Sequence, residues 1–313
     1  MKAKTLFINL IIIIVLLGII ELVCRAVLSR IYNRSFDSSL IEERKYGSSD
    51  GLKANANGIV WGKAFNTDEL GGRKTQPSTG KKKRLYIGDS VTEGVGVDDT
   101  STFANRMSII NTSNDVRNFS LIGYSTADYV NVLKHYVSTD SSIASVAVFY
   151  CLNDVYSKAS SKDLPAMAKQ NLLGKINGLL QNDYATYKLL KLFVYHNSNS
   201  YYRYDSQFYT EDNAMFQQAI ADLKTCDSIC KAKGLQFKVC ILPYRSQLSN
   251  GASKVPQQKV AAFAKQNNIT YVDISPALAS DGKPKELYLF ADEIHFSAKG
   301  HQKIAEYLQT IGF

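Results

Sequence analysis

The sequence predicts an α/β protein in which helices cover a parallel sheet, with a transmembrane helix ahead of it. Short apolar runs alternate along the chain with segments of helical periodicity, which is typical of parallel strands joined by helices. Most of these runs carry little charge, as strands buried on both faces do. A charge-free stretch at the start of the chain predicts the transmembrane helix.

Composition is that of an ordinary folded protein with a sizeable core: 313 residues, 45% hydrophobic and 21% charged. The net charge of +9 suits an anionic polymer, an anionic membrane surface or solubility alone. Because the lysines are scattered apart from Lys81–Lys83, we expect no nucleic-acid partner. The five cysteines lack metal-site spacing and the sequence contains no HExxH motif, so no metal is expected. No cofactor is expected either.

The N-terminus is expected to be an uncleaved membrane anchor, residues 1–25. Lys2 and Lys4 precede a charge-free run, residues 5–20, which Glu21 interrupts. With Glu21 at the interface, the segment reaches the roughly 20 residues that a span needs. A cleaved signal peptide and a buried helix are the alternatives, but no small-residue cleavage site follows the run.

Orientation follows less directly, because basic residues flank both ends of this segment. A single N-terminal segment with lysines ahead of it usually keeps that end in the cytoplasm. We therefore expect a single-pass signal-anchor with the rest of the chain outside the cytoplasm, in the periplasm or at the cell surface.

A stalk and an irregular lead-in, residues 26–83, are expected between the anchor and the α/β domain. Residues 26–46 are mixed and charged, which favours a helical stalk. The remainder is rich in Gly, Ser, Asn and Lys, and is expected to be irregular structure packed on the domain through Trp61 and Phe65.

Residues 84–313 are expected to form the α/β domain. Its strands are short apolar or β-branched runs, the clearest of which is IASVAVFY at 143–150. The expected strands are residues 85–87, 115–121, 143–150, 237–242 and 269–274.

The expected helices have apolar residues at helical spacing, and several have recognisable ends. Ser125 and Ser297 stand at N-cap positions, and Gly234 follows its helix as a C-cap. His301, in the last helix, is expected to be exposed. The expected helices are residues 102–110, 125–137, 213–233, 255–266 and 297–310.

A helical insertion is expected at about residues 155–210. It is rich in tyrosine, and such rings either stack on sugars or, more commonly, pack helices together. The tyrosines are Tyr184, Tyr187, Tyr195, Tyr201, Tyr202, Tyr204 and Tyr209.

Polar residues follow the strands at one edge of the predicted sheet, because right-handed crossovers collect these loops there. Ser90 comes directly after the first strand in Gly88-Asp89-Ser90. A serine at this edge is either a nucleophile or the cap of the next helix. Gly123 and Asn153 follow the next two strands.

Four motifs carry a resemblance to the SGNH (GDSL) hydrolases. Gly88-Asp89-Ser90, with Thr92 and Gly94 after it, resembles the nucleophile block of that family. NFSLIG at 118–123, Asn153-Asp154, and Asp292 three residues before His295 resemble its other three blocks, in the same order. Cys151 stands where the third block usually has glycine, and the long insertion departs from the family pattern.

The resemblance implies a flavodoxin-like three-layer α/β/α sandwich and a Ser-His-Asp triad. Ser90 would be the nucleophile, His295 the base that takes its proton, and Asp292 the carboxylate that orients the imidazole. The N–H groups of Ser90 and Gly123 and the side-chain amide of Asn153 would form the oxyanion hole. Glu293, beside Asp292, is expected to be a surface acid.

The function expected on this basis is a membrane-anchored serine esterase. It would remove an O-acyl group, most simply acetyl, from an envelope or extracellular carbohydrate. An O-acyltransferase with the same triad, a lipase or thioesterase, and a non-enzymatic glycan-binding domain are the alternatives. The presence of Ser90, Asp292 and His295 argues against the last of these.

Overall fold

The computed structural model describes residues 2–77, 82–111, 113–156, 184–194, 198–248 and 253–313. The chain divides into two compact units. One contains residues 1–34 and 165–197, and the other contains residues 35–164 and 198–313.

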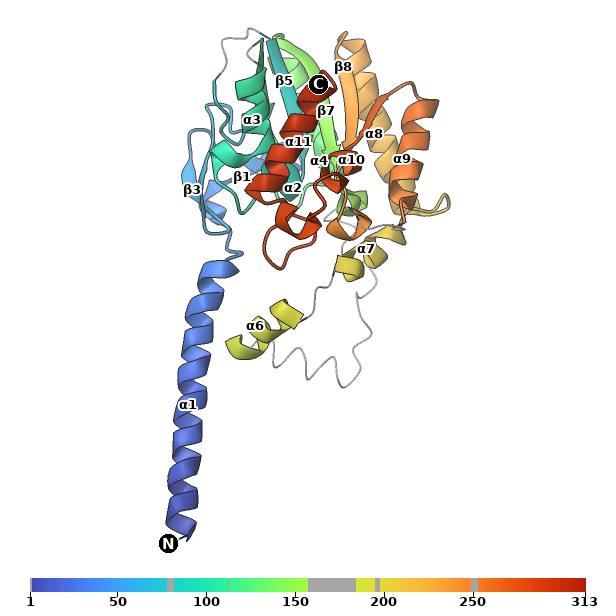
Figure 1. The fold of residues 1–313 in the computed structure, drawn as a ribbon. Coiled ribbons are helices and arrows are strands. Elements are labelled where there is room, and N and C mark those ends of the chain that lie inside the picture. The colour runs from blue at the N-terminus through green and yellow to red at the C-terminus, as the bar shows by residue number, and fades with distance from the viewer. Residues whose placement is uncertain (1, 78–81, 112, 157–183, 195–197, 249–252) are drawn as a thin grey trace. The chain divides into compact units, whose positions relative to one another are not determined.

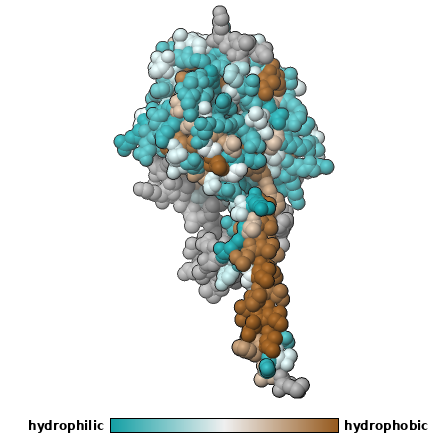
Figure 2. Space-filling model, turned by 90° about the vertical axis from the view of Figure 1, so that its left-hand side faces the viewer, coloured by the Kyte–Doolittle hydropathy of each residue, from teal (hydrophilic) through white to brown (hydrophobic). Residues whose placement is uncertain are grey.

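The first unit contains α1 (Lys2–Ile31) and α6 (Ala185–Val194). Among the described residues, α1 is the one helix long and apolar enough to cross a membrane, and Figure 2 shows its hydrophobic surface. The helix ends at Ile31, so the prediction that a helical stalk continues through residue 46 is wrong. Its length and composition agree with the predicted membrane-spanning helix.

The second unit is built around a five-stranded parallel sheet, as the sequence predicts (Figure 1). The strands stand in the order β6-β5-β7-β8-β9, so the first strand of the sheet along the chain is next to the centre and the second is at an edge. This is the flavodoxin-like order. The strands are β5 (Lys82–Gly88), β6 (Asn114–Asn118), β7 (Ile143–Tyr150), β8 (Gln236–Ile241) and β9 (Thr270–Asp273).

Helices cover both faces of this sheet and complete the three-layer sandwich (Figure 1). On one face α3 (Phe103–Ile110) packs beside α11 (Ala298–Thr310), and on the other α4 (Thr126–Thr139) packs beside α8 (Ala214–Ala232). The fifth, α9 (Val255–Gln266), lies against β9.

The lead-in is more regular than the sequence predicts. It forms two antiparallel hairpins, β1 (Ile41–Tyr46) with β2 (Ser49–Leu52) and β3 (Asn57–Val60) with β4 (Lys63–Asn66). The tip of the second hairpin is Trp61-Gly62, with φ of 51° and 73°. Two successive positive φ values match the tight two-residue turns that suit the twist of a hairpin.

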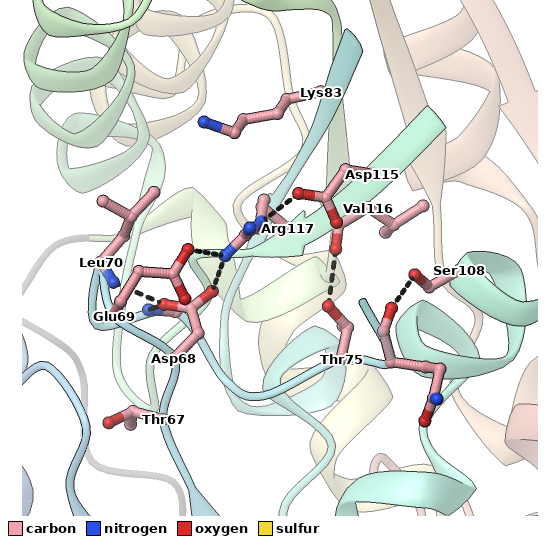
Figure 3. Close-up of polar contacts among 12 residues, drawn as sticks. Thr67, Asp68, Glu69, Leu70, Thr75, Lys83, Ser108, Asp115, Val116 and Arg117 are labelled. Carbon is pink, nitrogen blue, oxygen red and sulfur yellow. Dashed lines mark hydrogen bonds and ion pairs between the residues drawn. The ribbon is translucent and has the colours of Figure 1, made fainter. Parts of the chain in front are cut away.

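Polar contacts fasten the rest of the lead-in to the edge strand β6 (Figure 3). Arg117 of β6 donates to the carboxylates of Asp68 (2.9 Å), Glu69 (2.8 Å) and Asp115 (2.7 Å). The hydroxyl of Thr75 donates to the backbone oxygen of Val116 (2.7 Å). The contacts of Asp68, Glu69 and Thr75 hold residues 67–76 against the sheet. The exact division into anchor, lead-in and α/β domain stays a prediction.

Most of the predicted insertion, residues 157–183 and 195–197, lies outside the described residues. The described part contains α6 and, in the second unit, α7 (Ser198–Ser206). Tyr209 is buried, and its hydroxyl lies 2.8 Å from that of Tyr150 and donates to the backbone oxygen of Leu152 (2.7 Å). At this position the packing interpretation of the tyrosines is the better one.

Candidate active site

Ser90 lies where β5 ends and a single helical turn, α2 (Ser90–Glu93), begins. The helix cap is Asp89, whose carboxylate accepts the N–H of Val91 at 2.9 Å. The alternative role of Ser90 as the cap is therefore wrong. Gly88 must be small, because a Cβ there would lie 2.6 Å from Cβ of Thr92 and 2.8 Å from the backbone oxygen of Phe149. Ser90, two residues after the end of β5, therefore lies at the carboxyl edge of the sheet.

The hydroxyl of Ser90 is in hydrogen-bond contact with the imidazole of His295, which is 205 residues away in the chain. Oγ of Ser90 lies 2.9 Å from Nε2 of His295, and Nδ1 of His295 lies 2.9 Å from Oδ2 of Asp292. An ionised Asp292 keeps the ring proton on Nδ1, which leaves Nε2 free to accept the serine proton. A hydroxyl, a base and an orienting carboxylate in this order can perform nucleophilic catalysis.

Asp292 also fixes the backbone of its own loop. Its other carboxylate oxygen, Oδ1, accepts the N–H groups of Ile294 (2.7 Å) and His295 (2.8 Å). The backbone N–H of Leu289 donates to the oxygen of His295 at 2.9 Å, which closes the loop. The three-residue spacing therefore lets one carboxylate hold both the loop and the imidazole.

The structure also brings Asn153 to this site. Asn153 lies in a turn, η3 (Leu152–Val155), directly after β7. Its amide nitrogen donates to Oδ2 of Asp89 at 3.3 Å, and Oγ of Ser90 lies 3.3 Å from the same oxygen. Its amide oxygen accepts the hydroxyl of Tyr244 at 3.3 Å. Hydrogen bonds to both its nitrogen and its oxygen thus hold the Asn153 amide beside Ser90.

Gly123 follows β6 in a turn and has φ of 81°, a conformation that favours glycine. The two residues before it are tied to the Ser90 region. The N–H of Leu121 donates to the oxygen of Gly88 (3.3 Å), and the N–H of Ile122 donates to Oε2 of Glu93 (2.8 Å). These bonds keep the Gly123 turn beside the elements that carry Ser90.

Comparison with known families decides the classification. Residues 86–303 match the GDSL-like lipase/acylhydrolase family, over more than half of the chain. The chain belongs to this family. As a GDSL-family member it is an ester hydrolase, and the predicted recognition and reaction class are confirmed.

Two solved structures show what this GDSL-family chain is similar to. A lipolytic G-D-S-L protein from Veillonella parvula is 13% identical, with 74% of this chain and 97% of that chain covered and a TM-score of 0.46. A catalytic mutant of an acetylxylan esterase from Geobacillus stearothermophilus is 18% identical, with 77% and 97% covered and a TM-score of 0.47. No curated protein matched the chain.

Two buried ionisable residues next to the site of this GDSL hydrolase were not predicted from the sequence. Glu93 is fully buried, and burial raises the pKa of its carboxyl to about 8. The guanidinium of Arg73, also buried, donates to the backbone oxygens of Glu93 (2.7 Å) and Val97 (2.6 Å) and to the carboxylate of Asp99 (3.0 Å). Together they brace the turn after Ser90. The only signal for Glu93 was its place three residues after Ser90.

Trp61 is a third residue whose place at the site only the fold reveals. The centroid of its ring lies 4.6 Å from that of His295, with the planes at 66°. The sequence predicted that Trp61 packs on the domain, but not against the imidazole. The hairpin β3–β4, ahead of the family match, therefore supplies one wall of the site.

Two expectations about charged or polar residues near the site are wrong. Glu293 is not a surface acid: it is 5% exposed, and both of its carboxylate oxygens accept hydrogen bonds from the guanidinium of Arg245. His301 is fully buried because its side of α11 faces α3, where its Nδ1 accepts the N–H of Phe103 at 3.2 Å. Burial lowers the pKa of His301 to about 3.

Cys151, which stands where the third motif of the family usually has glycine, precedes the turn that carries Asn153. The thiol is buried at the end of β7. The buried carboxylate of Asp154 accepts the N–H of Cys151 (2.6 Å) and the hydroxyl of Tyr129 (2.6 Å), which closes the turn that carries Asn153. Among the described residues, no group of His, Cys, Asp and Glu side chains is arranged to hold a metal ion.

Proposed function

We propose that this hydrolase is a serine esterase that removes O-acyl groups, in particular O-acetyl, from an envelope or extracellular carbohydrate. Ser90 is the nucleophile, His295 the general base and Asp292 the residue that orients it. The observation that carries the proposal is the continuous chain from Oγ of Ser90 through His295 to Asp292, with both contacts at 2.9 Å.

In the first half of the reaction, Ser90 attacks the carbonyl carbon of the ester while Nε2 of His295 takes its proton. The carbonyl oxygen becomes an oxyanion that accepts hydrogen bonds from the N–H groups of Ser90 and Gly123 and the amide of Asn153. Each such donor is worth about 3 to 4 kcal/mol of the barrier. The bond to the sugar oxygen then breaks, and that oxygen leaves with the proton held by His295.

In the second half, His295 takes a proton from water, and the resulting hydroxide attacks the acyl-serine. The bond between the acyl carbon and Oγ of Ser90 breaks, and the proton returns to Oγ. The free carboxylic acid leaves. Asp292 stabilises the imidazolium in both halves without itself taking the proton.

The cellular setting is part of the proposal. The apolar surface of α1 supports a single-pass anchor, and the lysines ahead of it support a cytoplasmic N-terminus. Protease added to spheroplasts should then degrade the domain, whereas full protection would reject this orientation.

Labelling with a fluorophosphonate probe tests the nucleophile. Wild type should be labelled and Ser90→Ala should not. Ser228→Ala is the matched control, because Ser228 is an exposed serine on α8 whose hydroxyl donates to the backbone oxygen of Lys224 in its own helix (2.9 Å). Labelling that persists in Ser90→Ala would refute the assignment.

The acyl group and the acceptor are tested together by product analysis. Incubation with an O-acetylated glycan should release free acetate. Acetate found on an added sugar instead would make the protein a transferase. Activity that rises towards long acyl chains in a series of nitrophenyl esters would overturn the acetyl assignment.

A further inference from the structure

We propose that α6 lies flat in the headgroup region of the membrane, docked on α1 through Glu21. The proposal rests on the membrane anchor proposed above and extends it, because it gives the first unit a second lipid contact. The residues that it involves are those of α1 and α6 and Tyr32, which follows α1; all of them belong to the first unit.

Glu21 is a charged residue at the end of an apolar run, and its carboxylate is well satisfied there. It accepts the N–H of Ala185 (2.7 Å), the N–H of Thr186 (3.0 Å) and the hydroxyl of Thr186 (2.8 Å). The guanidinium of Arg25 donates to it as well (2.9 Å). The first N–H groups of a helix have no partner within the helix, and a carboxylate there also suits the helix dipole. Glu21 thus joins the start of α6 to α1.

The position of Glu21 sets the depth of α6. The charge-free run, residues 5–20, spans roughly 24 Å as a helix, close to the ~30 Å thickness of a hydrocarbon core. Glu21 therefore falls at one boundary of that core. Since the first two N–H groups of α6 donate to Glu21, the N-terminus of α6 lies at the same boundary.

The two faces of α6 differ in a way that fits this depth. Nζ of Lys188 lies 5.2 Å from the ring centroid of Tyr32, which follows the C-terminal end of α1. The side of α6 that carries Lys188 therefore points along α1 away from the apolar run. Leu190 comes two residues later, so it projects on nearly the opposite side, and it is 59% exposed.

These two sides of α6 suit binding to a lipid surface. Leu190 would enter the acyl region of the membrane, the region that the exposed apolar residues of α1 also occupy. The two helices would then present one continuous apolar surface to the lipid. Lys188 and Lys191 would stay at the level of the headgroups, where anionic lipids attract them. A helix that presents an exposed leucine on one side and lysines on the other can bind in the plane of the interface.

Quenching of tryptophan emission by brominated acyl chains tests the depth of α6. Because Trp61 is the only tryptophan, Trp61→Phe in the full-length chain gives a silent background. Leu190→Trp, the probe, and Lys188→Trp, its matched control, are placed in nanodiscs of phosphatidylglycerol and phosphatidylcholine, with and without bromine. Leu190→Trp should lose about half of its emission or more, and Lys188→Trp clearly less. Weak quenching of both would overturn the proposal, as would equal strong quenching.

A third probe, Val15→Trp in the middle of α1, separates this inference from the anchor on which it rests. Strong quenching at position 15 with none at 190 would refute only the placement of α6. No quenching at position 15 would refute the anchor. Adding Glu21→Ala to the Leu190→Trp chain should reduce quenching at 190, since the start of α6 is then released from α1. Unchanged quenching would exclude Glu21 as the docking residue.

Discussion

The buried carboxyl of Glu93 gives a sharp test, because it links stability and activity. Replacing it by Gln keeps the volume and an oxygen that accepts the N–H of Ile122, and removes only the ionisable group. Its other oxygen, Oε1, is buried without a hydrogen-bond partner among the described residues, a setting that an uncharged carboxyl tolerates better than an ionised one. Glu93→Gln is therefore a mimic of the protonated acid.

The magnitude follows from the pKa of Glu93, which burial raises from 4.5 to about 8. The folded protein holds this proton between these pH values while the unfolded chain does not. Wild type therefore loses stability as pH rises from 4.5 to 8, by about 1.4 kcal/mol per pH unit and roughly 5 kcal/mol in all. Glu93→Gln has no such loss, so its advantage over wild type should grow with pH across this window and stay constant above it.

Urea unfolding of the chain from residue 35, followed by circular dichroism at pH 5, 6, 7 and 8, measures this difference. A difference between Glu93→Gln and wild type that does not change with pH would refute the reasoning. Activity adds a second readout. Glu93→Gln should retain most of kcat, whereas Glu93→Ala, which frees the Gly123 turn, should lower kcat by on the order of tenfold or more.

Three further predictions concern the site and its support. Asn153→Ala should lower kcat by roughly 10² to 10³ with little change in KM, as for an oxyanion-hole donor; an unchanged kcat in steady-state assays would remove Asn153 from that role. His301 has a pKa of about 3 in the folded protein against an ordinary value of 6.5, so its contribution to stability is present above pH 6.5 and lost as pH falls towards 3. Urea midpoints of His301→Gln should therefore fall less between pH 7 and pH 5 than those of wild type, and parallel declines would contradict this. Trp61→Ala should lower kcat about 2- to 10-fold, since an aromatic pair is worth ~0.5 to 1.5 kcal/mol, and Trp61→Phe should recover most of it. Equal activity of all three proteins would show that the Trp61 ring does not position His295.

Much of the fold was predictable, because its signals are local. The run IASVAVFY forms β7 over the predicted residues, and Ser297 caps α11 through its hydroxyl, which accepts the N–H of Gly300 at 3.2 Å. The hairpins of the lead-in were missed. Their strands are only four to six residues long and mostly polar, so they lack the alternation that marks a strand.

The candidate site likewise contains residues that the sequence identified and residues that only the structure revealed. Ser90, Asn153, Asp292 and His295 were identified from short motifs, and the structure brings all four together. The roles of Trp61 and Glu93 were not predicted, because each depends on a contact with a residue far away in the chain. Glu293 and His301 were expected at the surface for the same reason. Glutamate is mostly exposed and histidine is intermediate, and the burial of these two depends on distant partners, Arg245 and Phe103.

By itself the sequence determined the order of strands and helices, the apolar N-terminal helix and the motifs that mark the catalytic chemistry. These are properties of neighbouring residues, set by periodicity, capping and turn geometry. Only the tertiary structure decided which hydroxyl meets which imidazole, which charges are buried, and that a hairpin ahead of the family match borders the site. Those outcomes depend on contacts between distant segments, which local sequence patterns do not encode.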